Sequence, residues 1–445
     1  MRKWNVLPDR EMLEQCFVLS LLVNGRTLVQ ECEPSQEVLR FAEALQEFGL
    51  NCKQVADQIV LEGVGMGYRV PVVLPQDFSL NANTLILALA SKNSDTDYTI
   101  LASSAEELAE KKKLLLHVAK VNVKEETENS ISFSFKPKSQ NLICSKNGSY
   151  PYLQRNFALL SALVLGETLA FDERMAIRDQ WSSMLKYFGV NLSYEVQMPE
   201  FKDEFERRLA KAQGIKMIKT WKTYLDETHT LSPREYFVPG DVTLASAYAL
   251  AALLSSTPER KQDVFSNVVS SSSRASVFTI LKRMGAELDF LGKHERYGEP
   301  FADLAVKPLL TKRLQGCHFS GDSLSASIEE IPVLAVAACF AEKETIFHLP
   351  AEEVVRKRHW LELLATNLRK TGAEIGVYED GLVVRGKEEP DRAEFDCEGY
   401  PVMGLAFYVL KVVTKSPFDI MGIEVTEKLF PNALEIIDQI CGKEA

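Results

Sequence analysis

The sequence has few of the patterns that hold metals or disulfides. Its eight cysteines are scattered and include no CxxC pair, and its six histidines show no spacing typical of metal ligands. These absences argue against a zinc site and against a disulfide framework. We therefore expect free cysteines in a reducing cytoplasm, and neither a metal nor any other cofactor.

Long apolar runs are missing as well. The uncharged apolar stretches are short: CFVLSLLV from Cys16 and IPVLAVAACFA from Ile331, for example, have 8 and 11 residues. A membrane-spanning helix needs about 20 such residues, so we expect no contact with a membrane. The N-terminus MRKWNVLPDRE has a basic start but no apolar core and no cleavage site, so no signal peptide is predicted.

Positive charge is in deficit. The chain has 51 basic and 62 acidic residues, which gives a formal net charge of −11. Such an acidic chain is a poor candidate for binding nucleic acid, although a local basic pocket could still hold a small anion. No GxGxxG follows a predicted strand, which disfavours a single dinucleotide-binding domain.

What the chain of 445 residues does contain is an internal repeat. An apolar helix rich in small residues, a polar break and a strand recur six times. The copies begin at Phe17, Leu85, Phe157, Tyr248, Val333 and Leu405.

A second pattern lies between these copies. It is an amphipathic helix that ends in glycine and is followed at once by a strand, as in LKRMGAEL from Leu281. The glycines are Gly49, Gly189, Gly285 and Gly372, and glycine just past a helix is the usual left-handed cap. The two patterns together predict an α/β chain of six β-α-β-α-β-β units, each about 60–75 residues long.

Three segments of the second half resemble the enolpyruvyl transferases, and EPSP synthase (3-phosphoshikimate 1-carboxyvinyltransferase) in particular. They are VPGDVTLASAYALAALL from Val238, IEEIPVLAVAACFAEKETI from Ile328 and LRKTGAEIGVYEDGLVV from Leu368. The resemblance extends over nearly the whole chain. It implies two domains of three units each, joined by a two-stranded hinge, with a ligand cleft between them.

We place the domain boundary at the VPGD segment. The expected amino-terminal domain is residues 10–238, and the expected carboxy-terminal domain is residues 1–9 with 239–445. A stretch near 200–235 does not fit the repeat, and FKDEFERRLAKA from Phe201 reads as an exposed amphipathic helix inserted into the first domain.

In this family, the enolpyruvyl group of phosphoenolpyruvate is transferred to shikimate-3-phosphate, a step of aromatic amino acid biosynthesis. Each substrate carries a phosphate and a carboxylate, so a site for both needs several arginines or lysines. Most of the family's matching positions have changed here. Four arginines are replaced by Gln15, Leu87, Trp360 and Tyr400, a serine by Glu11, and a backbone-contacting glycine by Asn83.

Other matching positions keep a usable group. The resemblance implies Glu329 and Arg356 as catalytic residues. It implies Arg10, Asn81, Gln154, Asp241, Lys357 and Lys428 as residues that bind substrate. Each also has a purely structural interpretation: Asp241 follows Gly240 where a helix N-cap is expected, and Glu329 precedes a helix start, where acids are favoured.

Three functions remain open from the sequence. The chain is interpreted first as a weak or inactive paralogue that keeps the two-domain scaffold. The alternatives are an authentic divergent EPSP synthase and a related enolpyruvyl transferase with a different acceptor. If it is active, its partners are shikimate-3-phosphate and phosphoenolpyruvate, and we expect a monomer.

The predicted location of any bound anion is the second half. Arg356, Lys357, Arg358 and Lys428 are its candidate ligands, because the first half places Glu11, Leu87 and Leu153 where donors would be needed. With ligand groups on one domain alone, we expect either an open cleft or one closed by apolar contacts through Trp360 and Tyr400.

Overall fold

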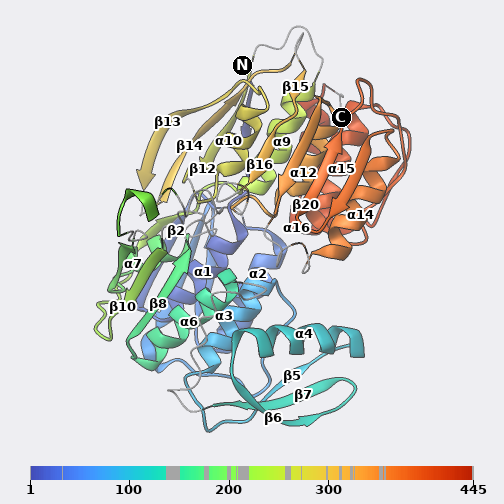
Figure 1. The fold of residues 1–445 in the computed structure, drawn as a ribbon. Coiled ribbons are helices and arrows are strands. Elements are labelled where there is room, and N and C mark those ends of the chain that lie inside the picture. The colour runs from blue at the N-terminus through green and yellow to red at the C-terminus, as the bar shows by residue number, and fades with distance from the viewer. Residues whose placement is uncertain are drawn as a thin grey trace.

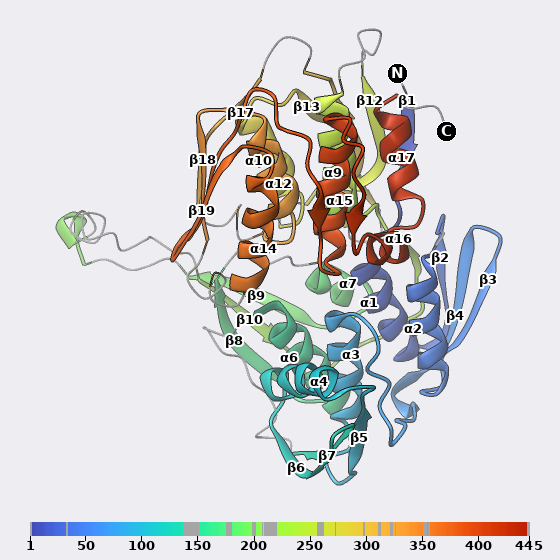
Figure 2. The ribbon, with the colours of Figure 1, turned by 90° about the vertical axis from the view of Figure 1, so that its right-hand side faces the viewer.

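The protein folds into two groups of helices, one above the other, with sheets on the outside of each group (Figures 1 and 2). Both chain ends lie on the upper group. The computed structural model describes residues 2–32, 34–136, 151–174, 180–197, 202–206, 208, 220–255, 262–271, 273–296, 299–309, 313–320, 324, 326–349, 354 and 357–442.

The lower group is built from the first three repeat units, which we call the first half. Each unit has an apolar helix, a strand, a second helix and two further strands. Unit one is α1 (Arg10–Leu21), β2 (Asn24–Gln30), α2 (Gln36–Gln46), β3 (Asn51–Val55) and β4 (Gln58–Val64). Unit two is α3 (Leu80–Ala90), β5 (Tyr98–Leu101), α4 (Ala105–Val118), β6 (Val121–Glu126) and β7 (Ser130–Phe135). Unit three is α6 (Pro151–Leu165), β8 (Leu169–Arg174), α7 (Trp181–Tyr187), β9 (Leu192–Gln197) and β10 (Thr220–Leu225).

The upper group is built from units four to six, the second half. Unit four is α9 (Val242–Leu254), β12 (Asp263–Val269), α10 (Ser276–Arg283), β13 (Leu288–Arg296) and β14 (Glu299–Val306). Unit five is β16 (His318–Ser320), α12 (Ile331–Cys339), β18 (Glu344–His348), α14 (Arg358–Arg369), β19 (Glu374–Tyr378) and β20 (Gly381–Arg385), beside the short pair β15 (Leu314–Gln315) and β17 (Ala341–Glu342). Unit six is β21 (Phe395–Asp396), α15 (Pro401–Val413), β22 (Ile420–Met421), α16 (Glu424–Leu429) and α17 (Ala433–Ile440).

The sheets repeat one topology. In units one to five the last strand lies in the middle and pairs antiparallel with both other strands, as β4 does with β2 and β3. The sixth unit is shortened, since its described residues form only the parallel pair β21–β22. The predicted architecture of six repeated units is therefore confirmed, with five complete sheets and one reduced one.

The four predicted glycine caps are confirmed. Gly49, Gly189, Gly285 and Gly372 have φ angles of 111°, 98°, 95° and 80°. A residue with a Cβ is strained in this left-handed region, so glycine lets each second helix turn directly into its strand.

The two halves exchange their first strands. Strand β1 (Arg2–Asn5) precedes α1 but pairs in parallel with β12 of unit four. Strand β11 (Glu235–Phe237) precedes α9 but pairs in parallel with β2 of unit one. The connecting segments run antiparallel, with the Asp9 amide donating to the Pro239 carbonyl at 2.9 Å and the Asp241 amide to the Leu7 carbonyl at 2.8 Å. These pairings support the division at residues 9 and 238, which stays a prediction.

The prediction of a non-repeating insertion near 200–235 is wrong in part. Residues 220–225 form β10, which is the middle strand of the third sheet. This strand was not predicted from the sequence because a long connection separates it from β9. In the other units the corresponding two strands are joined by a short connection. Residues 204–206 and 208 are helical and exposed, as expected for FKDEFERRLAKA, and most of the rest of that segment lies outside the described residues.

The first helices of the units form the core. Helix α12 is buried throughout, α9 along all but its last residue, Leu254, and α3 along all but its first, Leu80. Helices without a polar face must be covered all round, so the units can only be stable when they pack together. None of the described helices combines the length and the apolar character needed to cross a membrane.

Substitution of Gly63 in β4 tests how closely α1 packs against its sheet. A Cβ at this position would overlap the carbonyl oxygens of Ser20 and Val23 at the end of α1. We expect Gly63→Ala to lower the free energy of unfolding by about 3 kcal/mol, the upper end of the range for overpacked cores. Urea denaturation measures it, and Gly67→Ala is the matched control, because a Cβ there meets nothing within 4 Å. Equal stability of the two variants would contradict the packing described here.

Candidate active site

The start of α1 carries the first group of candidate residues. Asp9 caps the helix, because its carboxylate accepts the Met12 amide at 3.0 Å. The following turn is dominated by charge, with Arg10, Glu11 and Glu14 on a helix that is otherwise almost entirely buried. Two carboxylates at the position where the family binds anionic substrates are unfavourable for such ligands.

Glu14 lies at the centre of this group. Its carboxylate accepts the Ser79 hydroxyl at 2.8 Å and the Asn81 side-chain amide at 2.9 Å. Ser79 is the N-cap of α3, and Asn156 on α6 donates to Asn81 at 3.1 Å. The Glu14 carboxylate therefore occupies the N-terminus of α3, a natural site for anions, from within the chain.

Burial controls the protonation of Glu14. The side chain is almost fully buried, and desolvation raises its pKa from 4.5 to about 7, although Arg10, Asn81 and Ser79 act in the opposite direction. The carboxyl group is thus partly protonated near neutral pH. Glu14 was not among the candidates from the sequence. The feature that could have pointed to it is an acidic residue inside an otherwise apolar helix.

Arg10 is already engaged by carboxylates. It lies 3.8 Å from Glu14 and 3.4 Å from Glu37 on α2. Burial alone would lower its pKa, but Glu14 and Glu37 outweigh that effect and raise the pKa above its ordinary value. The predicted role of Arg10 in binding substrate stays a prediction, and a substrate would have to compete with these two internal partners.

Several replaced positions have structural roles instead. The Asn83 side chain donates to the carbonyls of Gln76 and Phe78 at 3.1 Å, so it holds the segment that precedes α3. Leu87 and Leu153 are fully buried. The predicted ligand Gln154 donates to the His117 carbonyl at 3.0 Å, which ties α6 to the end of α4.

The second half holds another group of candidate residues. Asp241 caps α9 by accepting the Leu244 amide at 2.8 Å, which matches its structural interpretation. The proposed catalytic Glu329 is paired with Lys357 at 2.8 Å. The same ammonium group lies 4.6 Å from the ring centre of Trp360, which has taken the place of an arginine.

The remaining cations of the predicted anion site are dispersed. Arg356 lies outside the described residues, so its predicted catalytic role is not addressed by the structure. Arg358 pairs with Glu362 one turn further along α14, at 2.8 Å. Lys428 is exposed on α16. The structure thus joins Arg10 with Asn81 through Glu14, and Glu329 with Lys357, but it leaves Gln154 and Lys428 out of both contacts.

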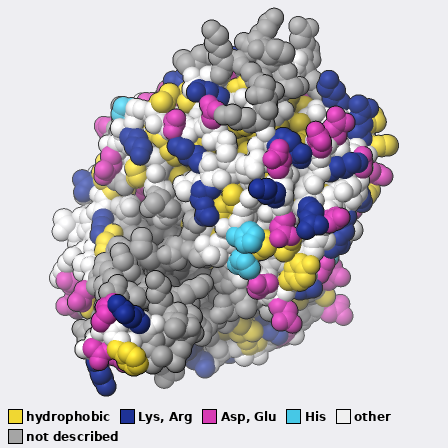
Figure 3. Space-filling view, turned by 45° about the horizontal axis from the view of Figure 1, so that its top comes forward, with side chains coloured by type: hydrophobic (Ala, Val, Ile, Leu, Met, Phe, Trp, Pro, Cys, Tyr) yellow, Lys and Arg dark blue, Asp and Glu magenta, His cyan; other side chains and the backbone are white. Residues whose placement is uncertain are grey.

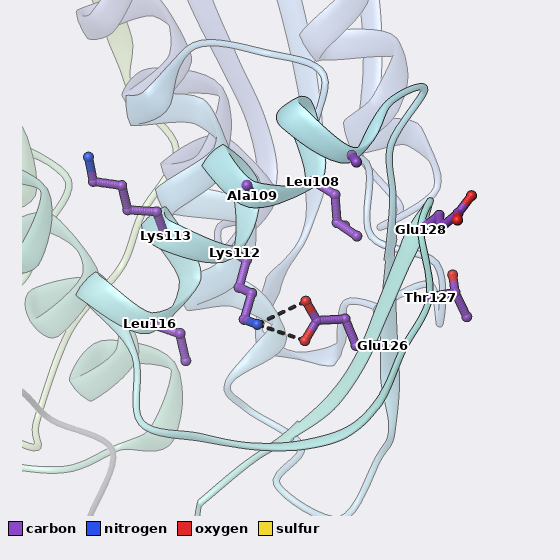
Figure 4. Close-up of a pocket in the computed structure, with 9 residues that line it drawn as sticks. Leu108, Ala109, Lys112, Lys113, Leu116, Glu126, Thr127 and Glu128 are labelled. Carbon is purple, nitrogen blue, oxygen red and sulfur yellow. Dashed lines mark hydrogen bonds and ion pairs between the residues drawn. The ribbon is translucent and has the colours of Figure 1, made fainter.

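A cavity among the described residues lies elsewhere, on the outside of unit two. It has a volume of about 380 Å³ between α4 and the β6–β7 hairpin, and Lys112 pairs with Glu126 at its edge at 2.7 Å (Figure 4). None of the candidate residues lines it.

The described part of the chain also contains no group of three or more metal-ligating side chains. On the face drawn in Figure 3, basic and acidic side chains are mixed rather than gathered into one basic patch.

Comparison with known proteins identifies the family. A family profile described as EPSP synthase (3-phosphoshikimate 1-carboxyvinyltransferase) matches residues 151–437, more than half of the chain. The chain belongs to the EPSP synthase family. Most of the matched residues lie in the second half, which also contains the similar segments from Val238, Ile328 and Leu368.

Relatives cover nearly the whole chain at low identity. The 3-phosphoshikimate 1-carboxyvinyltransferase of Bacillus pumilus is 24% identical over 438 residues, which is 97% of this chain and 95% of that protein. The Bacillus subtilis protein of the same name is 24% identical over 443 residues, 98% of this chain and 96% of its own. At this distance the fold is retained while individual side chains of the site can differ.

Solved structures show the same fold. An EPSP synthase from Acinetobacter baumannii superposes with a TM-score of 0.71 at 21% identity, covering 98% of this chain and 95% of that one. The enolpyruvyl transferase NikO from Streptomyces tendae superposes with a TM-score of 0.64 at 13% identity, covering 99% of this chain and 94% of that one. The predicted enolpyruvyl transferase-like fold is confirmed.

The buried Glu14 gives this EPSP synthase relative a specific pH dependence. The folded chain holds the Glu14 proton up to about pH 7, whereas the unfolded chain releases it near pH 4.5. Its contribution to stability is therefore complete below pH 4.5 and is lost as the pH rises through 7. We expect Glu14→Gln, which stays neutral, to be up to about 3 kcal/mol more stable than the original chain at pH 8 and about equally stable at pH 4.

Urea denaturation at the two pH values measures the difference. Glu43→Gln, at an exposed position of α2, is the matched control and should show no such pH-dependent gain. A Glu14→Gln variant that is less stable than the original chain at pH 8 would show that Glu14 is needed in its ionised form.

Proposed function

We propose that this chain keeps the EPSP synthase fold but has lost tight binding of shikimate-3-phosphate and phosphoenolpyruvate, so that it transfers the enolpyruvyl group weakly or not at all. The observation that carries the proposal is the Glu14 carboxylate at the N-terminus of α3, hydrogen-bonded to Ser79 and Asn81. A substrate anion at this helix end would have to approach an acidic group that already accepts hydrogen bonds from the Ser79 and Asn81 side chains.

Lost arginines support the same conclusion. Each charge-assisted hydrogen bond contributes about 1.5–3 kcal/mol, and four matched arginines are replaced, at Gln15, Leu87, Trp360 and Tyr400. Such losses are not additive, but their simple sum of roughly 6–12 kcal/mol is comparable to the ~8 kcal/mol of a micromolar complex. Leu87 is fully buried, and Trp360 is nearly so and lies against the Lys357 ammonium group, so neither position offers a replacement cation.

The alternative of an authentic, divergent EPSP synthase is favoured by the groups that remain. Glu329 keeps a carboxylate at the family's catalytic position, and Asp241, Gln154 and Lys428 keep the family's residue types. In that case Lys357 would have to release Glu329 when substrate binds. A third alternative, a less anionic acceptor, would place weaker demands on the missing arginines. In each case we propose a cytoplasmic monomer that binds no nucleic acid.

An activity assay separates these functions. With shikimate-3-phosphate and phosphoenolpyruvate at millimolar concentration, we expect phosphate release no faster than without protein. We also expect no measurable rise in melting temperature, whereas a micromolar ligand at a thousand-fold excess would stabilise the fold by about 4 kcal/mol. The Bacillus subtilis relative, assayed in parallel, is the control for the reagents. Steady phosphate release, or a shift of several degrees, would establish the authentic-enzyme alternative instead.

A further inference from the structure

Arg274 is a buried arginine at the junction between the two halves. It lies two residues before α10 in unit four, and its side chain is 1% exposed. A guanidinium group cannot lose its charge inside a protein, so a buried arginine must be neutralised by neighbouring carboxylates. Its partners therefore show what it holds together.

All three partners of Arg274 belong to other parts of the fold. One guanidinium nitrogen pairs with Asp9, the cap of α1 in the first crossing segment, which is also 1% exposed. The other lies 3.4 Å from Glu11 in the first turn of α1 and 3.0 Å from the side-chain oxygen of Gln180 at the start of α7. Gln180 also donates to Glu11 at 3.4 Å, which closes the cluster.

These contacts connect the halves. Helix α10 lies in the upper group and helices α1 and α7 lie in the lower group (Figure 1). Asp9, Glu11 and Gln180 come from two different units of the first half and its hinge, whereas Arg274 comes from the second half. One side chain thus fixes the second half against two elements of the first, at the edge of the site that contains Glu14.

The charges of the cluster depend on one another. Without Arg274, the Asp9 and Glu11 carboxylates would lie close together, with Asp9 buried and deprived of its counter-ion. Removing one member of a buried ion pair is strongly destabilising, because the other charge is left buried without a partner. The cluster therefore strongly favours the arrangement in which the two halves are in contact, and it needs no ligand to do so.

We propose that Arg274, anchored by Asp9 at the hinge, is a built-in lock that holds the two halves together through Glu11 and Gln180 in the absence of ligand. The proposal rests on the domain division at residues 9 and 238 and extends the proposed function, because a chain closed by its own ion pairs gains no further closure from substrates. Glu11, which replaces a serine of the family motif, is the residue that brings the first turn of α1 into the lock.

Small-angle X-ray scattering and hydrogen exchange test the lock on the full chain without ligand. For the original chain we expect a radius of gyration near 22 Å, the value for a compact protein of this length. Millimolar shikimate-3-phosphate with phosphoenolpyruvate should leave it unchanged. In Arg274→Met we expect a larger radius, and about tenfold faster exchange at the amides of residues 9–12 and 180–184.

Two further variants keep the test decisive. Glu11→Gln retains the buried Asp9–Arg274 pair and should fold, yet it removes the charge that connects Arg274 to α1, so it should show the same changes to a smaller degree. Arg385→Met is the control, because Arg385 pairs with Glu344 and Glu374 within a single sheet. It should leave the radius and the exchange of residues 9–12 unchanged.

The outcomes are distinct from those of the activity assay. An original chain that contracts when the substrates are added, or a Glu11→Gln variant with the radius and exchange of the original, would overturn the lock. Phosphate release by a chain that stays compact throughout would instead overturn the proposed loss of activity and leave the lock standing.

Discussion

The exchange of first strands between the halves is the constraint on which the rest of the structure depends. Because β1 completes the sheet of unit four and β11 completes the sheet of unit one, the chain must cross between the halves twice. The two crossing segments pair with each other through Asp9–Pro239 and Asp241–Leu7 backbone hydrogen bonds. Each segment then ends in an aspartate that caps an apolar helix, so the hinge and the starts of α1 and α9 are placed by the same few bonds.

That arrangement also decides where chemistry could occur. Charged and polar side chains cluster at helix starts: Arg10, Glu11 and Glu14 on α1, Asn81 on α3, and Glu329 and Glu330 before α12. Helix starts favour acidic groups, and here the chain places its own acidic side chains there. Glu14 is held by Ser79 and Asn81 at α3, and Glu330 accepts the Thr243 hydroxyl of α9 at 2.5 Å.

Cations in the site are likewise satisfied from within. Arg10 faces Glu14 and Glu37, Lys357 faces Glu329, and Arg274 faces Asp9 and Glu11. A site with internal ion pairs at each of these points must break them before it can bind an anion. Arg10, Lys357 and Arg274 thus each have carboxylate partners within the protein, with which an anionic ligand would have to compete.

Periodicity and spacing in the sequence were sufficient to predict the repeat and the four glycine caps, and the resemblance of three segments to the enolpyruvyl transferases implied the fold. These features depend on local patterns: an apolar helix, a residue that tolerates positive φ, and an alternating strand. The helix cap at Asp241 was predictable for the same reason. Strand β10 was not, because a strand separated from its partners by a long connection has no local signal that reveals its neighbours.

Tertiary structure alone decided which charges meet. Glu14 and Asn81 are 67 positions apart, and Arg274 and Asp9 are 265 apart, so neither contact has a signature in sequence spacing. Burial, which raises the pKa of Glu14 to about 7, exists only once α1, α2 and α3 have packed around it. The sequence thus determined which elements form, and the packing of distant elements determined which charged side chains meet at the starts of α1 and α3.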